Sequence, residues 1–279
     1  LDVIAGARGR DFLRGGAGVN VLARHVGIEV RVVDIGVAFD FEGVSGLIHK
    51  KVMPGTKNLL VESAMSPAQA EQALQVGIEL ATEAAQQGIG LIGTGEMGIG
   101  NTSAASLILS RLGGSNIADC TGAGTGLDAS GIDRKTAVLR EVLACHAGVT
   151  APLDVLAAFG GFEMATMLGA VFQAAAERRV IVVDGFITTA VILVANALEA
   201  EILQRCVFAH RSDERGHGLM LEHLNAKPLM DMGLRLGEGS GAALAWPIFN
   251  PFKPDCMLTS MPCSNPAAAA ERFTMACWN

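Results

Sequence analysis

The sequence is poor in positive charge. Only 21 of its 279 residues are Lys or Arg, charged residues of both signs make up 18%, and the formal net charge is −7. Proteins that bind nucleic acid carry a basic patch or stripe, and no basic block is present here. The composition therefore predicts no nucleic-acid partner and favours a small-molecule ligand.

Paired cysteines are also missing. Six cysteines lie far apart, with no CxxC pair, at positions 120, 145, 206, 256, 263 and 277. This excludes the usual zinc-knuckle and redox motifs, and isolated thiols suit a reducing cytosol. His217 and His223 lack the spacing of two metal ligands on one helix face. We expect no metal and no cofactor, and a cytoplasmic protein.

No apolar run is long enough to span a membrane. The longest, residues 186–198, falls short of the ~20 residues that a spanning helix needs, and residues 1–10 do not resemble a signal peptide. Half of the residues are apolar and 34 are glycine, enough to bury a large core in one or two domains. We expect no membrane partner and little disorder.

Short β-branched runs alternate with longer segments rich in Ala and Leu. Five strands are expected, at residues 29–35, 88–93, 115–120, 179–184 and 205–209. Helices are expected at residues 11–26, 66–87, 102–112, 134–146, 152–158, 164–176, 186–198 and 216–224. Ser66 and Pro67 are typical of a helix start. This order predicts an α/β fold, a doubly wound, Rossmann-like and mostly parallel sheet with helices on both faces.

The last part of the chain has a different composition. From Pro247 onward prolines are frequent, helical periodicity is lost, and half of the cysteines occur there. We therefore divide the chain into an α/β domain at residues 1–246 and a loop-rich tail at residues 247–279, in which no catalytic element is expected.

Three glycine-rich segments could bind a phosphate. They are GTGEMGIG (93–100), GAGTG (122–126) and GEGSG (237–241). The first two follow expected strands, and the first and third precede helices, so their amides could approach an anion without obstruction by a Cβ atom. Tight turns that need positive φ explain each segment about as well. Three such segments at one sheet edge favour a ligand site, because ligands bind beyond the carboxyl ends of parallel strands.

The first segment also matches the G-x-G-x-x-G pattern of dinucleotide-binding folds. Asp119 lies roughly where a ribose-binding acid would be expected, which makes an NAD(P)-dependent oxidoreductase one alternative. Glu96, however, is inside the turn and would repel a pyrophosphate. The pattern therefore gives only weak support to this alternative.

A few polar residues near these segments could carry chemistry. Glu238 suits a general base but could equally be a carboxylate at a helix start. Asp184 could orient a ribose or cap the following helix. Arg134 and Lys135 could meet a phosphate or be solvated surface charges. His210 follows the fifth expected strand at the same sheet edge.

Nine ordered motifs resemble the nicotinate-nucleotide:dimethylbenzimidazole phosphoribosyltransferase family. They are FLRGGAGVNVLAR, VVDIGVAFDF, GLIHKKVMPGTKN, GTGEMGIGNTSAAS, TGAGTGLD, PLDVLAAFGGFE, VDGFITTA, AHRS and DMGLRLGEGSGAALA. They run from Phe12 to about Ala245 and cover most of the chain. A match of this length and order is far more specific than one glycine pattern.

The resemblance implies a homodimer that transfers phosphoribose from nicotinate mononucleotide to 5,6-dimethylbenzimidazole or a related base. The product is α-ribazole 5′-phosphate, used in cobalamin assembly. Glu238 would take the N–H proton of the base. The resemblance places substrate contacts on Glu96, Met97, Gly98, Gly124, Lys135, Asp184, Ser212, Arg235 and Leu236.

The chain departs from the family pattern at both ends. The family's N-terminal Asp-His-Gly-Val stretch and Ser-x-x-Pro segment are not found, and its C-terminal helix is replaced by the Pro- and Cys-rich tail. Only remnants of the family's small helical domain are therefore expected. A non-catalytic or degenerate relative that binds a nucleotide or base is the second alternative.

Overall fold

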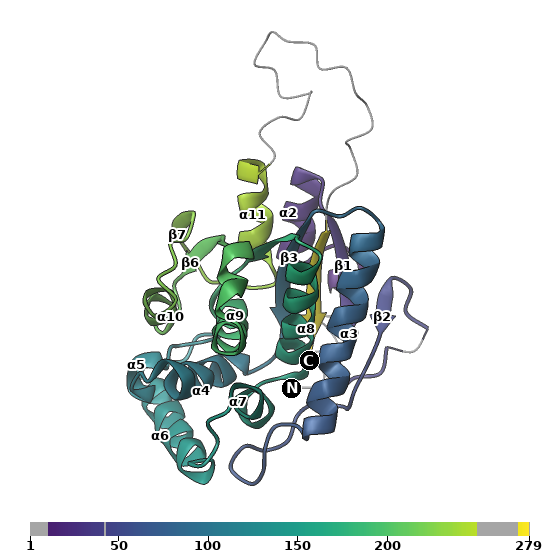
Figure 1. The fold of residues 1–279 in the computed structure, drawn as a ribbon. Coiled ribbons are helices and arrows are strands. Elements are labelled where there is room, and N and C mark those ends of the chain that lie inside the picture. The colour runs from purple at the N-terminus through teal and green to yellow at the C-terminus, as the bar shows by residue number, and fades with distance from the viewer. Residues whose placement is uncertain (1–10, 42, 250–272, 279) are drawn as a thin grey trace, which may run out of the picture.

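The computed structural model describes residues 11–41, 43–249 and 273–278. Six strands form one parallel sheet in the order β2-β1-β8-β3-β4-β5, and a second sheet pairs β6 with β7 (Figure 1). The strands of the large sheet are β1 (Glu29–Asp34), β2 (Leu47–His49), β3 (Leu91–Met97), β4 (Val180–Val183), β5 (Cys206–Phe208) and β8 (Phe273–Trp278). Those of the small sheet are β6 (His210–Ser212) and β7 (Met230–Leu234).

Helices connect the strands. They are α2 (Gly18–Val26), α3 (Pro67–Gln86), α4 (Asn101–Gly113), α5 (Ile117–Cys120), α6 (Ala129–Cys145), α7 (Pro152–Phe159), α8 (Phe162–Ala176), α9 (Phe186–Leu198), α10 (His217–His223), α11 (Ser240–Phe249) and the short 3-10 helix η1 (Ala200–Arg205). Helix α3 begins as predicted. Ser66 caps it, Pro67 is its first residue, and Gln69 completes a capping box. No helix among the described residues is long and apolar enough to cross a membrane.

Helices cover both faces of the large sheet, as predicted. Alternate residues of a strand point to opposite faces. In β4, Ile181 and Val183 belong to the main apolar core formed with α3, α8 and α9, whereas Val182 packs with residues of α11. In β1, Val32 likewise packs with Val19 of α2. Figure 1 shows α3 beside α8 on one side of the sheet, and α2 near α11.

The third expected strand is wrong. Residues 117–120 form the short helix α5, in which Asn116 caps the first turn by accepting a hydrogen bond from the amide of Ala118. An asparagine at the N-cap position accepts a hydrogen bond from an amide of the first turn and so stabilises the start of a helix. A local side-chain contact therefore overrides the weak strand pattern.

Several element boundaries also differ from the sequence predictions, and two of these differences bear on the glycine-rich segments and the site. The helix expected at residues 11–26 is interrupted, since Gly15 has φ 74° and α2 begins only at Gly18. The second expected strand ends later, because β3 extends through Met97. Gly93 and Gly95 therefore lie within a strand and not in a turn.

Two regular elements include residues of the expected loop-rich tail, residues 247–279. Helix α11 continues to Phe249 and includes Pro247. Strand β8 lies between β1 and β3 and pairs with both. The remainder of this tail, residues 250–272 and 279, is outside the described residues.

Candidate active site

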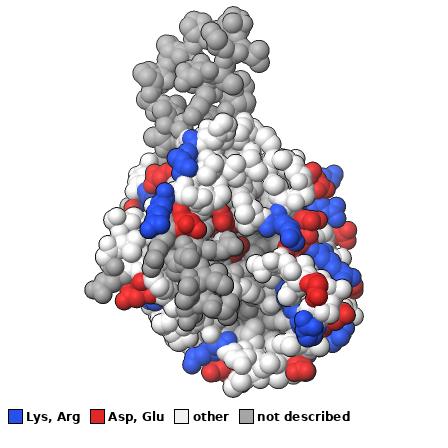
Figure 2. Space-filling view, turned by 180° about the vertical axis from the view of Figure 1, so that it is seen from behind, with Lys and Arg blue, Asp and Glu red and all other residues white. Residues whose placement is uncertain are grey.

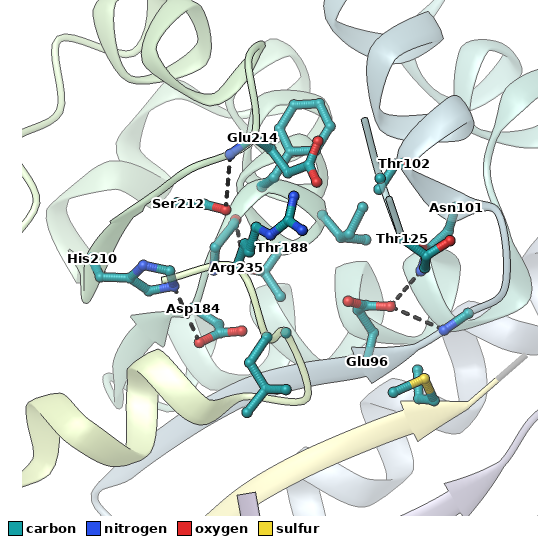
Figure 3. Close-up of a pocket in the computed structure, with 18 residues that line it drawn as sticks. Glu96, Asn101, Thr102, Thr125, Asp184, Thr188, His210, Ser212, Glu214 and Arg235 are labelled. Atoms are coloured by element: carbon teal, nitrogen blue, oxygen red, sulfur yellow. Dashed lines mark hydrogen bonds and ion pairs between the residues drawn. The ribbon is translucent and has the colours of Figure 1, made fainter. Parts of the chain in front are cut away.

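The site is a pocket of about 270 Å³ beyond the carboxyl ends of β3 and β4. Open parallel sheets place ligands at this edge, where loops between strands and helices leave side chains and amides unpaired by the ladder. Figure 3 shows the residues that line it. They are Glu96, Met97, Gly98, Asn101, Thr102, Gly124, Thr125, Asp184, Gly185, Phe186, Ile187, Thr188, His210, Ser212, Glu214, Arg235, Leu236 and Gly237.

All nine predicted substrate residues except Lys135 line this pocket. They come from segments far apart in the chain, namely the end of β3, the loop before α6, the end of β4, the end of β6 and the segment after β7. The fold thus brings together residues that the sequence separates by more than one hundred positions. The predicted base, Glu238, is the neighbour of Gly237 but does not itself line the pocket.

Glu96 is the carboxyl group at the end of β3. It is buried, and its Oε2 accepts hydrogen bonds from the amide of Gly98 at 3.0 Å and from the side chain of Asn101. Burial raises the pKa of Glu96 to about 7, and the nearby Asp184 and Glu238 act in the same direction. A carboxyl group with this pKa can exchange a proton near neutral pH.

Asp184 follows β4 and caps a helix distant in sequence. Its carboxylate accepts hydrogen bonds from the amides of Gly239, Gly241 and Ala242 at 3.2, 2.6 and 3.1 Å. The prediction that Asp184 caps the following helix α9 is therefore wrong, because the helix whose amides donate to it is α11. Burial raises the pKa of Asp184 to about 7, against the effect of these three amides.

Glu238 lies in a strained turn. Its φ is 66°, between Gly237 at 75° and Gly239 at 87°, a left-handed conformation that is unfavourable for a residue with a Cβ atom. Its amide donates to the carbonyl oxygen of Glu96 at 3.2 Å, so the turn is held against β3. The buried carboxylate accepts a hydrogen bond from the amide of Val19, at the start of α2, at 3.2 Å.

One end of the pocket suits an anion. The first residues of α4, Asn101 and Thr102, line it, and amides at a helix N-terminus attract negative charge. Lys135 lies behind them, where its Nζ donates to Thr102 Oγ1 at 2.9 Å and to the carbonyl oxygen of Gly122 at 3.4 Å. Burial lowers the pKa of this lysine, and the nearby Glu214 opposes the effect.

Several lining residues were missed by the sequence predictions. They are Asn101, Thr102, Thr125, Gly185, Phe186, Ile187, Thr188, Glu214 and Gly237. Each lies within four positions after a predicted site residue, and most lie where a strand or loop ends and a helix begins. That position was the available signal, since ligand-binding residues gather at such junctions. His210, noted at the sheet edge, also lines the pocket, with its Nε2 3.7 Å from Asp184 Oδ1.

The geometry does not favour the dinucleotide alternative. Gly93 and Gly95 are strand residues, so the G-x-G-x-x-G pattern does not form a phosphate-binding turn. Asp119 lies in α5, is largely exposed, and is 3.6 Å from an Arg215 nitrogen; it does not line the pocket. Within the described residues no group of three or more His, Cys, Asp or Glu side chains could hold a metal ion.

Comparisons with known proteins agree with the motifs. Residues 4–251 match a family model described as phosphoribosyltransferase. A nicotinate-nucleotide–dimethylbenzimidazole phosphoribosyltransferase from Variovorax paradoxus is 55% identical over 238 residues, 85% of this chain and 67% of the relative. A protein of the same name from Cupriavidus necator is 53% identical over 239 residues, 86% of this chain and 69% of the relative.

A solved structure is also similar. The crystal structure of CobT from Thermus thermophilus superposes with a TM-score of 0.86 at 37% identity, covering 90% of this chain and 75% of that one. The fold, the arrangement of the pocket and the extent of these matches lead to one conclusion. The chain belongs to the nicotinate-nucleotide–dimethylbenzimidazole phosphoribosyltransferase family.

Proposed function

We propose that this chain transfers phosphoribose from nicotinate mononucleotide to 5,6-dimethylbenzimidazole or a related base. The products are α-ribazole 5′-phosphate and nicotinate, and the reaction serves cobalamin nucleotide-loop assembly. The observation that carries the proposal is the convergence of eight predicted substrate residues on one pocket beside the Glu238 turn.

The phosphate of the donor is placed at the N-terminal end of α4. Gly98, Asn101 and Thr102 line this end, and Lys135 supplies positive charge from behind Gly124. A phosphate there would gain both helix-end amides and a cation, the usual combination in phosphate sites. The ribose would then extend toward the carboxyl groups of Glu96 and Asp184.

The transfer needs one proton acceptor. The C1′–N bond breaks and its electron pair goes to the pyridine nitrogen, which loses its positive charge, so the leaving nicotinate needs no acid. A lone pair of one benzimidazole nitrogen forms the new bond to C1′ from the opposite face. The other nitrogen then releases its proton to a carboxylate. A positioned general base contributes typically ~10²–10⁴ in rate.

Glu238 is proposed as that carboxylate. Its backbone conformation is strained, its side chain is buried, and its amide is bonded to Glu96, which lines the pocket. Strain of this kind persists where the surroundings impose it and is concentrated at functional sites. The role requires the carboxylate to exchange the Val19 amide for the base, beside Leu236 and Gly237, which precede Glu238 in the chain and line the pocket.

A product assay tests this role. The unmutated chain, Glu238→Gln and Glu96→Gln are incubated with nicotinate mononucleotide and dimethylbenzimidazole, and α-ribazole 5′-phosphate is measured. Glu238→Gln should lose about 10²-fold or more in kcat while still binding the donor. If Glu96→Gln loses kcat and Glu238→Gln does not, Glu96 is the base and the assignment to Glu238 is wrong.

Binding without transfer is the second candidate function. The observation that favours it is the orientation of the Glu238 carboxylate, which is bonded to α2 and does not line the pocket. The same assay separates the two functions. Saturable binding of nicotinate mononucleotide by the unmutated chain, with no product, would support the non-catalytic relative.

We also propose a cytoplasmic homodimer that binds no nucleic acid. The isolated cysteines and the acidic net charge support the location and the absence of a nucleic-acid partner. On the face shown in Figure 2, the described Lys and Arg side chains are interspersed with Asp and Glu. Sedimentation velocity should give twice the 28.9 kDa mass of the chain, and a single species of 28.9 kDa would contradict the dimer.

A further inference from the structure

His217 is a buried histidine outside the pocket that joins two of its walls. One wall is the start of α9, from Gly185 to Thr188, and the other is the end of β6 with Ser212. β6 pairs with β7 in the small sheet and not with the strands of the large sheet. Pairing with the large sheet ends just before this strand, since β5 pairs with β4 through Phe208 and the amide of Ala209 donates to the carbonyl oxygen of Val183 at 2.8 Å. From His210 onward, strand pairing with β4 no longer fixes Ser212 against the start of α9.

Two hydrogen bonds of the imidazole ring cross this gap. The amide of Ser212 donates to His217 Nδ1 at 2.7 Å, and His217 Nε2 lies 2.9 Å from Thr189 Oγ1. The hydroxyl of Thr189 in turn donates to the carbonyl oxygen of Gly185 at 2.7 Å. Ser212 and Gly185, which both line the pocket, are thus linked through the ring.

These bonds determine the protonation of the ring. Nδ1 accepts a hydrogen bond from the Ser212 amide and must therefore carry a lone pair. A neutral imidazole has one N–H group, which must then be on Nε2, and the hydroxyl proton of Thr189 is already directed at Gly185. A second ring proton would place two N–H groups, those of Nδ1 and Ser212, against each other.

We infer that His217 is a positioning residue, a neutral imidazole protonated at Nε2 that holds Ser212 and the Gly185 turn in place around the substrate. Ser212 takes part in this link through its amide alone. Its hydroxyl oxygen accepts a hydrogen bond from the amide of Glu214 at 3.4 Å, which leaves the hydroxyl proton to be donated on the pocket side. His210 and Arg211 are the charged or titratable neighbours of the ring. With burial as the main cause, they lower the pKa of His217 to about 3.

The identity of the substrate in this inference rests on the proposed function, whereas the first test needs no ligand. ¹⁵N NMR of the ring should show a neutral Nε2–H tautomer from pH 5 to 8. His217→Asn retains an acceptor near the place of Nδ1, and His217→Gln retains a donor near the place of Nε2. Amide exchange at Ser212 should accelerate in His217→Gln and not in His217→Asn. A ring that titrates near 6.5, or equal exchange in both variants, overturns the inference.

The second test measures binding of nicotinate mononucleotide by calorimetry and KM by the product assay. His217→Gln should weaken both by about 10- to 100-fold with a smaller change in kcat, because a buried amide loses its acceptor. Thr189→Val should match His217→Asn, and Thr189→Ser should resemble the unmutated chain.

The exposed His223, replaced by Asn and Gln, is the control on the same helix. A lowered melting temperature with unchanged binding and KM would mean a merely structural role and overturn the inference.

If the unmutated chain binds no nicotinate mononucleotide, the proposed function fails, and the NMR and exchange results decide the positioning role alone. If substitution of His217 prevents folding, the variants of Thr189 still test the link. Thr189→Val replaces only the hydroxyl group that is buried at one end of the link, and Thr189→Ser removes only a methyl group and keeps that hydroxyl.

Discussion

At the scale of single residues, the pocket contains two carboxylic acids whose pKa is raised by burial. Glu96 and Asp184 each have a pKa raised to about 7, and the nearby charge of Glu238 contributes to the rise in both. A carboxyl group whose pKa is higher in the folded chain than in the unfolded chain favours folding in its protonated form. These residues therefore contribute a penalty to stability that grows with pH.

Replacing Glu96 by Gln should make the free energy of unfolding less dependent on pH. The unmutated chain loses stability from the unfolded pKa of 4.5 up to about 7, and Gln removes this loss. The variant's advantage should thus be near zero at pH 4.5 and reach at most on the order of 3 kcal/mol above pH 7. Urea titrations at pH 5, 6, 7 and 8 measure it. A difference that stays constant across this range would contradict the raised pKa.

At the scale of elements, glycines allow backbones to meet where a side chain could not fit. A Cβ atom on Gly95 of β3 would lie 2.5 Å from both the carbonyl oxygen of Glu238 and the amide nitrogen of Gly239. On Gly77 of α3, it would lie 1.9 Å from the carbonyl oxygen of Thr166 in α8. Gly95 allows the strained turn to pack against β3, and Gly77 allows α3 and α8 to approach each other closely.

Gly95→Ala should impair activity more than stability. The added methyl group must displace the turn that carries Glu238, and a shift of about 1 Å at a reacting group can reduce the rate by about 10²-fold. The product assay and a thermal melt measure the two effects. Gly148→Ala is the control, since a Cβ atom there has no neighbour within 4 Å. Activity within twofold of the unmutated chain would show that the turn is not held by this contact.

Gly77→Ala should instead destabilise the whole chain. Alanine favours an isolated helix by ~1 kcal/mol, but overpacking against a fixed backbone costs typically ~1–3 kcal/mol and here exceeds the gain. The urea midpoint should fall with an unchanged slope, and Gly148→Ala should leave it in place. A raised midpoint in Gly77→Ala would mean that α3 and α8 do not approach closely at this residue.

At the scale of the whole molecule, the large sheet depends on the last described strand. β8 pairs with β1 from Glu29 to Asp34 and with β3 from Ile92 to Met97. The two halves of the sheet therefore meet only through β8 in the described strand order. The segment that the composition singled out as loop-rich contributes a central strand.

Removing residues 250–279 should abolish cooperative unfolding. Two strand edges would be left with unpaired amide and carbonyl groups, and exposed edges promote aggregation. The truncated chain should be insoluble or lack a sharp thermal transition, with deletion of Asn279 alone as the control. A soluble truncated chain with the midpoint of the full chain would show that β8 is dispensable.

The sequence by itself determined the features that depend on neighbouring residues or on ordered motifs. The apolar run before Asp184 predicted β4, and Ser66 with Pro67 predicted the start of α3. The motifs predicted the family and eight of the eighteen residues that line the pocket. Such features could be predicted because propensity, capping and motif spacing are local properties.

Only the tertiary structure decided which distant groups meet. It placed β8 in the middle of the sheet, made Asp184 the cap of α11, and directed the Glu238 carboxylate at the amide of Val19. Pairs like Val19 and Glu238 are 219 positions apart, so no local pattern encodes them. They form because the collapsed core brings their elements together, and buried polar groups then bond to whichever partner lies within reach.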